Sequence, residues 1–387
     1  MAGGGANGRG RGGLDGVVVA DTVLSHVDGE RGRLLVRGFD VEELAARAGF
    51  EDVYDLLTGG ALPDAARRAR IAAALGAARG DAFERLGALG DALAADDGME
   101  ALRAAMAHLR EADAPHATRA RLTGAAGVFA AAWARRRAGA APLAPDPTLP
   151  HAADVLRMAT GTADPARARA LDAYLVTVAE HGMNASTFTA RVVASTGSDL
   201  VSAVVAALGA LKGPLHGGAP GPVLDMLDGI ARPERAGAWL ETELAAGRRI
   251  MGLGHRVYRV RDPRAAVLED AVERLEAAGV GSRYLRLARS VERAAVGVLA
   301  RRHRGRRLET NVEFYTAVLL DAIGLPRALF TPIFAVGRVA GWLAHAEEQR
   351  AAGRLIRPEQ NYVGPRPGAT PPAGAAPAGP PAAAAAP

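Results

Sequence analysis

The sequence predicts a nearly all-α fold with one small β element near the N-terminus. Apolar residues recur at helical spacing in several segments, whereas the alternation typical of strands is scarce. The chain has 387 residues, which at about 150 residues per domain indicates two or three domains. Hydrophobic residues make up 49% and charged residues 23%, a composition typical of a folded protein. Disorder of the whole chain is therefore excluded.

Both ends of the chain are of low complexity. Residues 1–13 are rich in Gly with two Arg, and residues 366–387 are almost entirely Gly, Pro and Ala. Such segments bury too little apolar surface to offset the entropy of ordering, so both are predicted to be disordered tails. The N-terminal segment lacks the apolar stretch of a signal peptide, which predicts a cytoplasmic protein. Its Gly-Arg composition is compatible with RNA contact, but a solvated tail is the favoured interpretation.

The first structured elements are a short β segment and a helix. Gly16–Ala20 is a β candidate, followed by a second candidate at Val23–Val27 and a turn at residues 28–30. Asp40 and Glu43 have the spacing of a capping box, which predicts that a helix begins there.

Later segments predict further helices. Residues 171–178 and 201–208 place apolar side chains at i, i+3, i+4 and i+7, the spacing of one helix face. Ser198 and Asp199 are possible N-caps of the second segment. Residues 314–320 predict another buried helix. No internal repeat of 20–50 residues is evident.

Charge and residue usage exclude several kinds of site. The chain has 47 basic and 42 acidic residues, and all of the basic residues except Lys212 are Arg. Acidic residues lie among the arginines almost everywhere, so no basic stripe points to a nucleic-acid partner. Without Cys there is no disulfide, thiolate metal site or Cys nucleophile. The most apolar stretch, residues 317–344, contains charged residues and prolines, so no membrane span is expected.

Three histidines and one acidic residue are candidates for chemistry. His216 lies in GPLHGGAPG and His255 in MGLGH, both rich in residues that end helices, and His181 lies in EHGMNAST. Glu313 begins an apolar helical segment in TNVEFYTAVLL. Each alone is more typical of a helix cap or a core residue. The separations of the histidines offer no short metal-ligand spacing, so no metal is predicted, and the GxSxG motif of many serine hydrolases is absent.

Several longer motifs occur together and in one order. They read GVVVADTVLSHVDGERGRLLVRGFDVEELA, APDPTLPHAADVLRMATG, EHGMNASTFTARVVAS, GALKGPLHGGAP, MGLGHRVYRVRDPRA, TNVEFYTAVLLDAIGLP, RVAGWLAH and LIRPEQNYVGP. Through them the segment from about Leu14 to Pro365 resembles the citrate synthases of the shorter bacterial type. Members of that family condense acetyl-CoA with oxaloacetate and hydrolyse the resulting citryl-CoA. The resemblance implies an acyltransferase that forms a C–C bond.

The resemblance assigns three catalytic residues. Glu313 occupies the place of the family's aspartate base, one methylene longer than the usual residue. His216 matches the histidine that donates a hydrogen bond to the thioester oxygen, and a helix N-terminus near it would keep the ring neutral. His255 matches the histidine that polarises the ketone of oxaloacetate.

The resemblance also assigns binding residues. His181 matches a further substrate-contacting histidine, with Asn184 as its polar support, while three arginines match the positions that bind carboxylates: Arg264, Arg338 and Arg357. The last would reach into the partner subunit's site, which makes a homodimer part of the mechanism. Residues assigned to CoA are Gly252, Leu253 and Gly254 at the adenine and Arg259 at a phosphate. CoA thioesters enter as cosubstrates, and no bound cofactor or metal is implied.

The family fold consists of two helical domains. The resemblance places residues 14–217 and 325–365 in the large domain and residues 218–324 in the small one, with hinges at Pro220-Gly221 and at residues 324–326. Two alternative functions remain open. One is 2-methylcitrate synthase, which takes propionyl-CoA, because one methylene changes binding by only about 1–3 kcal/mol. The other is a catalytically weak CoA-binding paralogue, indicated by Glu313 and by Glu359, where relatives commonly have a basic residue.

Overall fold

The computed structural model describes residues 14, 16–217, 220–302, 308–362 and 364. They belong to two compact units, one formed by residues 22–356 and one by the segments up to Asp21 and from Arg357. Every helix and strand of the described residues lies in the first unit. The predicted tails at 1–13 and 366–387 lie outside the described residues.

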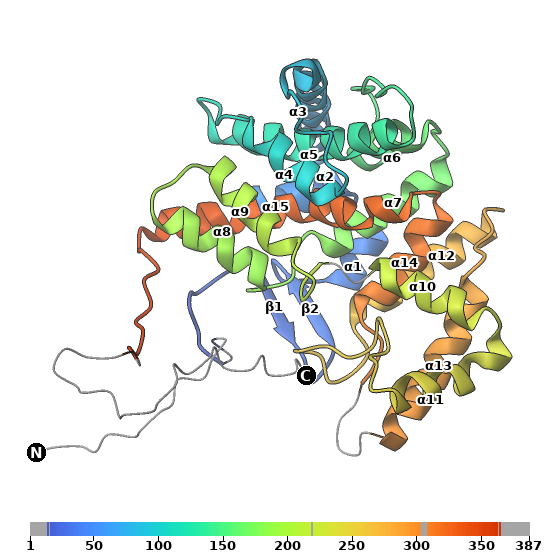
Figure 1. The fold of residues 1–387 in the computed structure, drawn as a ribbon. Coiled ribbons are helices and arrows are strands. Elements are labelled where there is room, and N and C mark those ends of the chain that lie inside the picture. The colour runs from blue at the N-terminus through green and yellow to red at the C-terminus, as the bar shows by residue number, and fades with distance from the viewer. Residues whose placement is uncertain (1–13, 15, 218–219, 303–307, 363, 365–387) are drawn as a thin grey trace, which may run out of the picture. The chain divides into compact units, whose positions relative to one another are not determined.

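A three-stranded antiparallel sheet opens the first unit. Its strands are β1 (Ser25–Asp28), β2 (Arg33–Val36) and β3 (Phe39–Asp40), in the order β1-β2-β3. The prediction of a strand at Gly16–Ala20 is wrong. A strand needs a neighbour to pair with, and β1 pairs with β2 instead, placing Ser25 opposite Val36 and the predicted turn at the tip of their hairpin (Figure 1).

Helices make up most of the remaining described residues, which confirms the predicted all-α class. The predicted helical segments at 171–178, 201–208 and 314–320 lie in α7, α9 and α14. The α-helices are α1 (Val41–Arg47), α2 (Phe50–Gly59), α3 (Ala65–Glu84), α4 (Gly98–Ala107), α5 (Pro115–Arg137), α6 (His151–Thr160), α7 (Pro165–Val178), α8 (Ala185–Ser195), α9 (Leu200–Leu211), α10 (Pro220–Ile230), α11 (Ala236–Ala245), α12 (Pro263–Ala277), α13 (Leu285–Arg302), α14 (Val312–Ala322) and α15 (Phe330–Ala352).

Two helix starts were predicted from the sequence, and they have different outcomes. Asp199 caps α9 as predicted, since its side chain accepts the Ser202 N–H at 2.7 Å. Asp40 is the N-cap residue of α1, but the predicted capping box is wrong because its carboxylate makes no cap hydrogen bond. That carboxylate accepts hydrogen bonds from Arg33 Nε and Nη2 at 3.1 and 2.9 Å instead.

Helix α15 forms the centre of the core. It packs against α2, α4, α5, α7, α8 and α9, and Figure 1 shows it passing among them. The segment Arg327–Ala352 is long and apolar enough to cross a membrane by length and composition alone. However, 89% of its apolar window is buried inside the fold, which identifies it as a core helix.

A second group of helices lies beside this core. Helices α10 to α14 pack on one another, and Figure 1 shows them gathered together in yellow to orange. Contacts of α12 with α1 and α7 join the group to the earlier helices. The division into a large domain of residues 14–217 and 325–365 and a small domain of residues 218–324 stays a prediction.

Candidate functional site

Three loops bring histidines close to one another. His181 lies between α7 and α8, His216 follows α9, and His255 lies between α11 and α12. The rings of His181 and His255 are edge to face, with centroids 5.5 Å apart. Tyr258 contacts both, since its Oη lies 3.2 Å from His181 Nε2 and its ring centroid 4.8 Å from that of His255. Residues distant in sequence thus form one cluster.

The hydrogen bonds of His255 fix which ring nitrogen carries its proton. Its Nδ1 accepts the backbone N–H groups of Val257 at 3.0 Å and Tyr258 at 3.1 Å. Burial, followed by the positive charge of Arg264, lowers the pKa of His255 to about 4. The neutral ring therefore carries its proton on Nε2, which can donate to an oxygen acceptor.

His216 is held by the N-terminus of α8. The Ser186 N–H, in the first turn of that helix, donates to His216 Nε2 at 3.3 Å, and Ser186 Oγ lies 2.8 Å from the same nitrogen. Burial, followed by the charge of Arg338, lowers the pKa of His216 to about 4. The ring is neutral with its proton on Nδ1, in agreement with the prediction that a helix N-terminus lies against it.

Asn184 supports this arrangement from the N-cap position of α8. Its Oδ1 accepts the Thr187 N–H at 3.1 Å and the Ser186 hydroxyl at 2.8 Å. Its Nδ2 donates to the backbone carbonyls of His181 and Gly182. Asn184 therefore links the His181 loop to the helix that holds His216, and direct contact with substrate stays a prediction.

Glu313 provides a buried carboxylate in the first turn of α14. Asn311 caps this helix by accepting the Glu313 N–H at 3.0 Å. Glu313 Oε2 is buried and has no hydrogen-bond partner among the described residues. Burial raises the pKa of Glu313 to about 8, although Arg264 and Arg338 lower it in part. Near neutral pH this side chain can therefore hold or release a proton.

Arg338 is a buried cation without a carboxylate partner. No Asp or Glu oxygen of the described residues lies within 4.0 Å of its guanidinium, although the side chain is only 1% exposed. Its Nε donates to the Val178 carbonyl at 2.5 Å, and burial lowers its pKa to about 10. Gly337 on α15 allows this approach, because a Cβ there would lie 2.7 Å from Val178 Cγ2. An unpaired buried guanidinium is suited to binding an anion.

Arg264 differs from Arg338 because its charge is already compensated. Its Nε and Nη2 donate to the two carboxylate oxygens of Asp262 at 3.0 and 2.7 Å. Asp262 Oδ2 also accepts the Val312 N–H at 3.2 Å. The buried pair therefore ties the start of α12 to the start of α14 and places a cation beside Glu313.

The glycine loop at residues 252–254 is tied to the start of α14. Gly252 and Gly254 have φ of +75° and +83°, and a Cβ on Gly252 would lie 2.8 Å from Phe314 Cβ. The Gly254 N–H donates to the backbone carbonyl of Glu309 at 2.8 Å, and the Gly252 carbonyl accepts the backbone N–H of Asn311 at 3.0 Å. Contact of this loop with adenine stays a prediction.

Two further predicted residues, Arg259 and Arg357, keep their assignments as predictions. The Arg259 side chain is more than half exposed, with Nε 4.0 Å from Glu30 Oε1. Its assignment to a CoA phosphate stays a prediction. Arg357 belongs to the terminal unit, and its assignment to a carboxylate of the substrate stays a prediction.

His181 lies where the charges of several other predicted residues reach it, and the assignment of these residues to one functional site stays a prediction. Burial and the charges of Arg264 and Arg338 together hold the pKa of His181 well below its usual value. The charges that His255 and His216 carry when protonated also lower the pKa of His181. The site therefore combines three neutral imidazoles, one protonatable carboxylate and two arginines.

Four residues of the site were missed by the sequence reasoning. Tyr258 and Asp262 stand within the quoted motif MGLGHRVYRVRDPRA, so their motif position was a usable signal. Ser186 stands in the first turn after the Asn184 cap. Trp342 Nε1 donates to Ser186 Oγ at 3.1 Å across 156 residues, a contact that no local pattern predicts.

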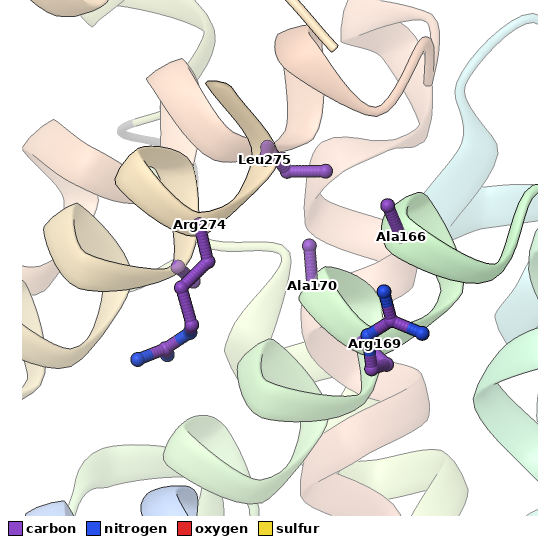
Figure 2. Close-up of a pocket in the computed structure, with 6 residues that line it drawn as sticks. Ala166, Arg169, Ala170, Arg274 and Leu275 are labelled. Atoms are coloured by element: carbon purple, nitrogen blue, oxygen red, sulfur yellow. The ribbon is translucent and has the colours of Figure 1, made fainter. Parts of the chain in front are cut away.

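A separate pocket of about 200 Å³ lies between α7 and α12. Figure 2 shows Arg169 and Ala170 on one side and Arg274 and Leu275 on the other. It contains none of the predicted site residues, so it is distinct from the histidine cluster. Within the described ranges, no three His, Asp or Glu side chains are grouped as metal ligands.

The fold is mostly helical, and the candidate site combines histidines with a buried carboxylate and a buried guanidinium. Residues 13–359 match the family model described as "Citrate synthase, C-terminal domain". The chain belongs to the citrate synthase family. This family membership supports a CoA-dependent enzyme that transfers an acyl group with formation of a C–C bond.

Similar proteins occur in bacteria and archaea. "Putative citrate synthase 2" of Mycobacterium tuberculosis is 40% identical over 92% of this chain and 93% of its own length. The citrate synthase of Acidithiobacillus ferridurans is 37% identical over 91% of this chain and 95% of its own length. The structure of the Thermotoga maritima enzyme aligns with a TM-score of 0.81 at 34% identity, covering 92% of this chain and 96% of that one.

Proposed function

We propose that this protein is a citrate synthase that condenses acetyl-CoA with oxaloacetate and water to give citrate and CoA. The observation that carries the proposal is the combination of Glu313, with its buried Oε2, and two histidines whose free N–H groups are fixed by backbone hydrogen bonds. The citrate synthase of Thermoplasma acidophilum, 27% identical with a TM-score of 0.82, has been solved with carboxymethyl coenzyme A and oxaloacetate. That complex supports the same pair of substrate classes here.

In the proposed mechanism, Glu313 begins the reaction as its carboxylate. It removes a proton from the methyl group of acetyl-CoA, a weak carbon acid, and the neutral His216 donates its Nδ1–H to the enolate oxygen. A donor already oriented toward developing charge stabilises the transition state without reorganisation. Positioned general bases typically contribute about 10²–10⁴-fold in rate.

The second half of the mechanism uses His255 and the arginines. The His255 Nε2–H polarises the ketone of oxaloacetate, and the methyl carbon of the enolate attacks the ketone carbon. The C–C bond forms as the ketone π bond breaks, and the former ketone oxygen takes the His255 Nε2 proton while Glu313 holds the proton from the methyl group. Water then adds its oxygen to the acyl carbon, the C–S bond breaks, and CoA leaves as the thiol; exchange with solvent returns Glu313 and His255 to their starting protonation states. Arg338 binds one substrate carboxylate with its unpaired guanidinium, while Arg264 adds a second cation and Arg357 a third from the partner subunit of a homodimer. His181 contacts the bound substrate beside these residues.

The proposal also includes binding of CoA through Gly252, Leu253, Gly254 and Arg259, closure of the two predicted domains over the substrates, and a cytoplasmic location. Closure would exclude water from the enolate until condensation is complete. The proposed reaction requires no metal ion and no permanently bound cofactor.

Thiol release from the purified protein tests the proposal. The assay supplies oxaloacetate with acetyl-CoA or propionyl-CoA and identifies the product by mass spectrometry. We expect rapid CoA release with citrate formed from acetyl-CoA. A higher kcat/KM with propionyl-CoA would make the protein a 2-methylcitrate synthase with the same mechanism. No release from either thioester, by a folded protein, would contradict the proposal and indicate a catalytically weak paralogue.

A further inference from the structure

The turn between β1 and β2 lies directly against the loop that carries His255. The Arg259 N–H donates to the Gly29 carbonyl at 2.9 Å. A Cβ added to Gly29 would lie 2.2 Å from the Val257 carbonyl oxygen and 3.0 Å from Val257 Cγ1. Real Cβ atoms do not approach a carbonyl oxygen so closely. The contact therefore requires glycine at position 29.

A second glycine of the same turn makes a second close contact. Gly32 has φ of +63°, a conformation that L-residues rarely adopt. A Cβ there would lie 2.6 Å from Val260 Cγ2 and 3.2 Å from the Arg261 carbonyl oxygen. Asp28 Oδ1 stabilises the turn by accepting the Arg31 N–H at 3.0 Å. The turn is thus shaped to receive residues 257–261.

The other part of the hairpin contacts the His181 loop. Ser25 Oγ donates to Glu180 Oε1 at 2.8 Å and accepts the Gly182 N–H at 3.1 Å. Glu180 also accepts from the Gly182 N–H at 2.7 Å and lies 3.0 Å from His345 Nε2. One hairpin therefore touches two of the three histidine loops of the site.

Three successive backbone amides connect the turn to the His255 ring. Those of Val257 and Tyr258 donate to His255 Nδ1, and the next one, of Arg259, donates to Gly29. A displacement of Val257 would therefore move both donors that orient the imidazole. It would also move Tyr258, whose Oη lies 3.2 Å from His181 Nε2.

We propose that the β1–β2 hairpin is a positioning element of the site, in which Gly29 sets the place of the His255 loop and thereby the direction of the His255 Nε2–H. Gly29 touches neither substrate nor reacting atom, so it acts through the loop. The inference rests on the proposed function for the role of His255. The geometric error that matters is small, because a misplacement of about 1 Å can reduce turnover about 10²-fold.

Gly29→Ala tests the inference with two independent readouts. Hydrogen exchange of the backbone amides at 257–259 reports whether the loop stays against the turn, and steady-state kinetics report whether His255 still acts. We expect faster exchange in these amides, unchanged exchange in α5, and a kcat about 10²-fold lower than in the wild type. The matched control is Gly237→Ala in α11, where a Cβ meets nothing within 4 Å, and both readouts should match the wild type.

A second pair of variants covers the case in which Gly29→Ala does not fold. Gly32→Ala should release the loop through its clash with Val260, and the added change Val260→Ala removes the clashing Cγ2. We expect Gly32→Ala to lower kcat and the double variant to recover part of it.

Two outcomes would overturn the inference. One is wild-type exchange at 257–259 in Gly29→Ala, and the other is faster exchange with an unchanged kcat. A wild-type protein that turns over no acyl-CoA would overturn the proposed function instead, and the exchange measurement would still test the contact of the turn with the loop.

Discussion

Replacing Glu313 by Gln should make the protein more stable and less active, and both effects follow from one buried carboxylate. The pKa of Glu313 is raised to about 8, mainly by burial, whereas the value in the unfolded chain is 4.5. Between these values the folded state keeps a proton that the unfolded state has released. Stability therefore falls as pH rises through this window, and the whole cost is present above the folded-state pKa.

The size of the effect follows from the two pKa values. A shift of one unit corresponds to about 1.4 kcal/mol, so the cost of the ionised side chain reaches about 5 kcal/mol above pH 8. At pH 5.5 the same linkage gives a much smaller cost, on the order of 1 kcal/mol. Gln has a similar shape and does not titrate. The stabilisation by Glu313→Gln should therefore grow by about 3 kcal/mol between pH 5.5 and pH 8.5.

Thermal unfolding at the two pH values measures this difference, with protein concentration held constant because dissociation of an oligomer also shifts Tm. We expect the Tm of the variant to exceed that of the wild type by several degrees more at the higher pH. The control is Glu276→Gln, at an exposed residue of α12, which should leave Tm nearly unchanged at both pH values. Equal Tm differences at both pH values, or a variant less stable at pH 8.5, would refute the reasoning. Turnover by Glu313→Gln should fall about 10²–10⁴-fold.

Three further predictions concern the arginines and Ser186. Arg338→Ala should raise the KM for oxaloacetate about 10²-fold. Arg338→Lys should also have a raised KM, because Lys lacks the planar fork that matches a carboxylate. Steady-state kinetics measure this KM, and a value near that of the wild type for either variant would contradict the prediction. Ser186→Ala removes the hydroxyl between Trp342 and His216 and should lower kcat about tenfold with little change in the KM for acetyl-CoA, while a wild-type kcat would argue against that support. If Arg357 acts in the partner's site, mixing and reassembling the inactive variants Arg357→Ala and His255→Ala should restore about a quarter of the activity, since random pairing gives half heterodimers with one intact site each. Continued inactivity of verified heterodimers would place Arg357 in its own subunit's site.

The helices were predictable because their signals are local. The apolar spacing at 171–178 and the cap at Asp199 depend on neighbours in the sequence, and both are present in the structure. Strand pairing is not local. Gly16–Ala20 is a plausible strand by composition but is not one, whereas the candidate at Val23–Val27 overlaps β1, and its partner strand Arg33–Val36 was not predicted.

The site was predictable to the extent that motifs mark it. His181, His216, His255 and Glu313 were singled out by their motifs, and the structure places them in one region, while their roles stay predictions. Their protonation states depend on burial and on contacts across the fold, such as that of Ser186 with His216. The difference between the paired Arg264 and the unpaired Arg338 is likewise a property of the folded chain.

The most direct test of the account is the pH dependence of kcat/KM for acetyl-CoA, with citrate identified as the product. His216 and His255, with pKa values of about 4, stay neutral across the range from pH 6 to pH 9 and contribute no change. We expect kcat/KM to rise about tenfold per pH unit below pH 8 and to level off above it, as Glu313 loses its proton. A profile that is flat down to pH 6, or a product other than citrate, would contradict it.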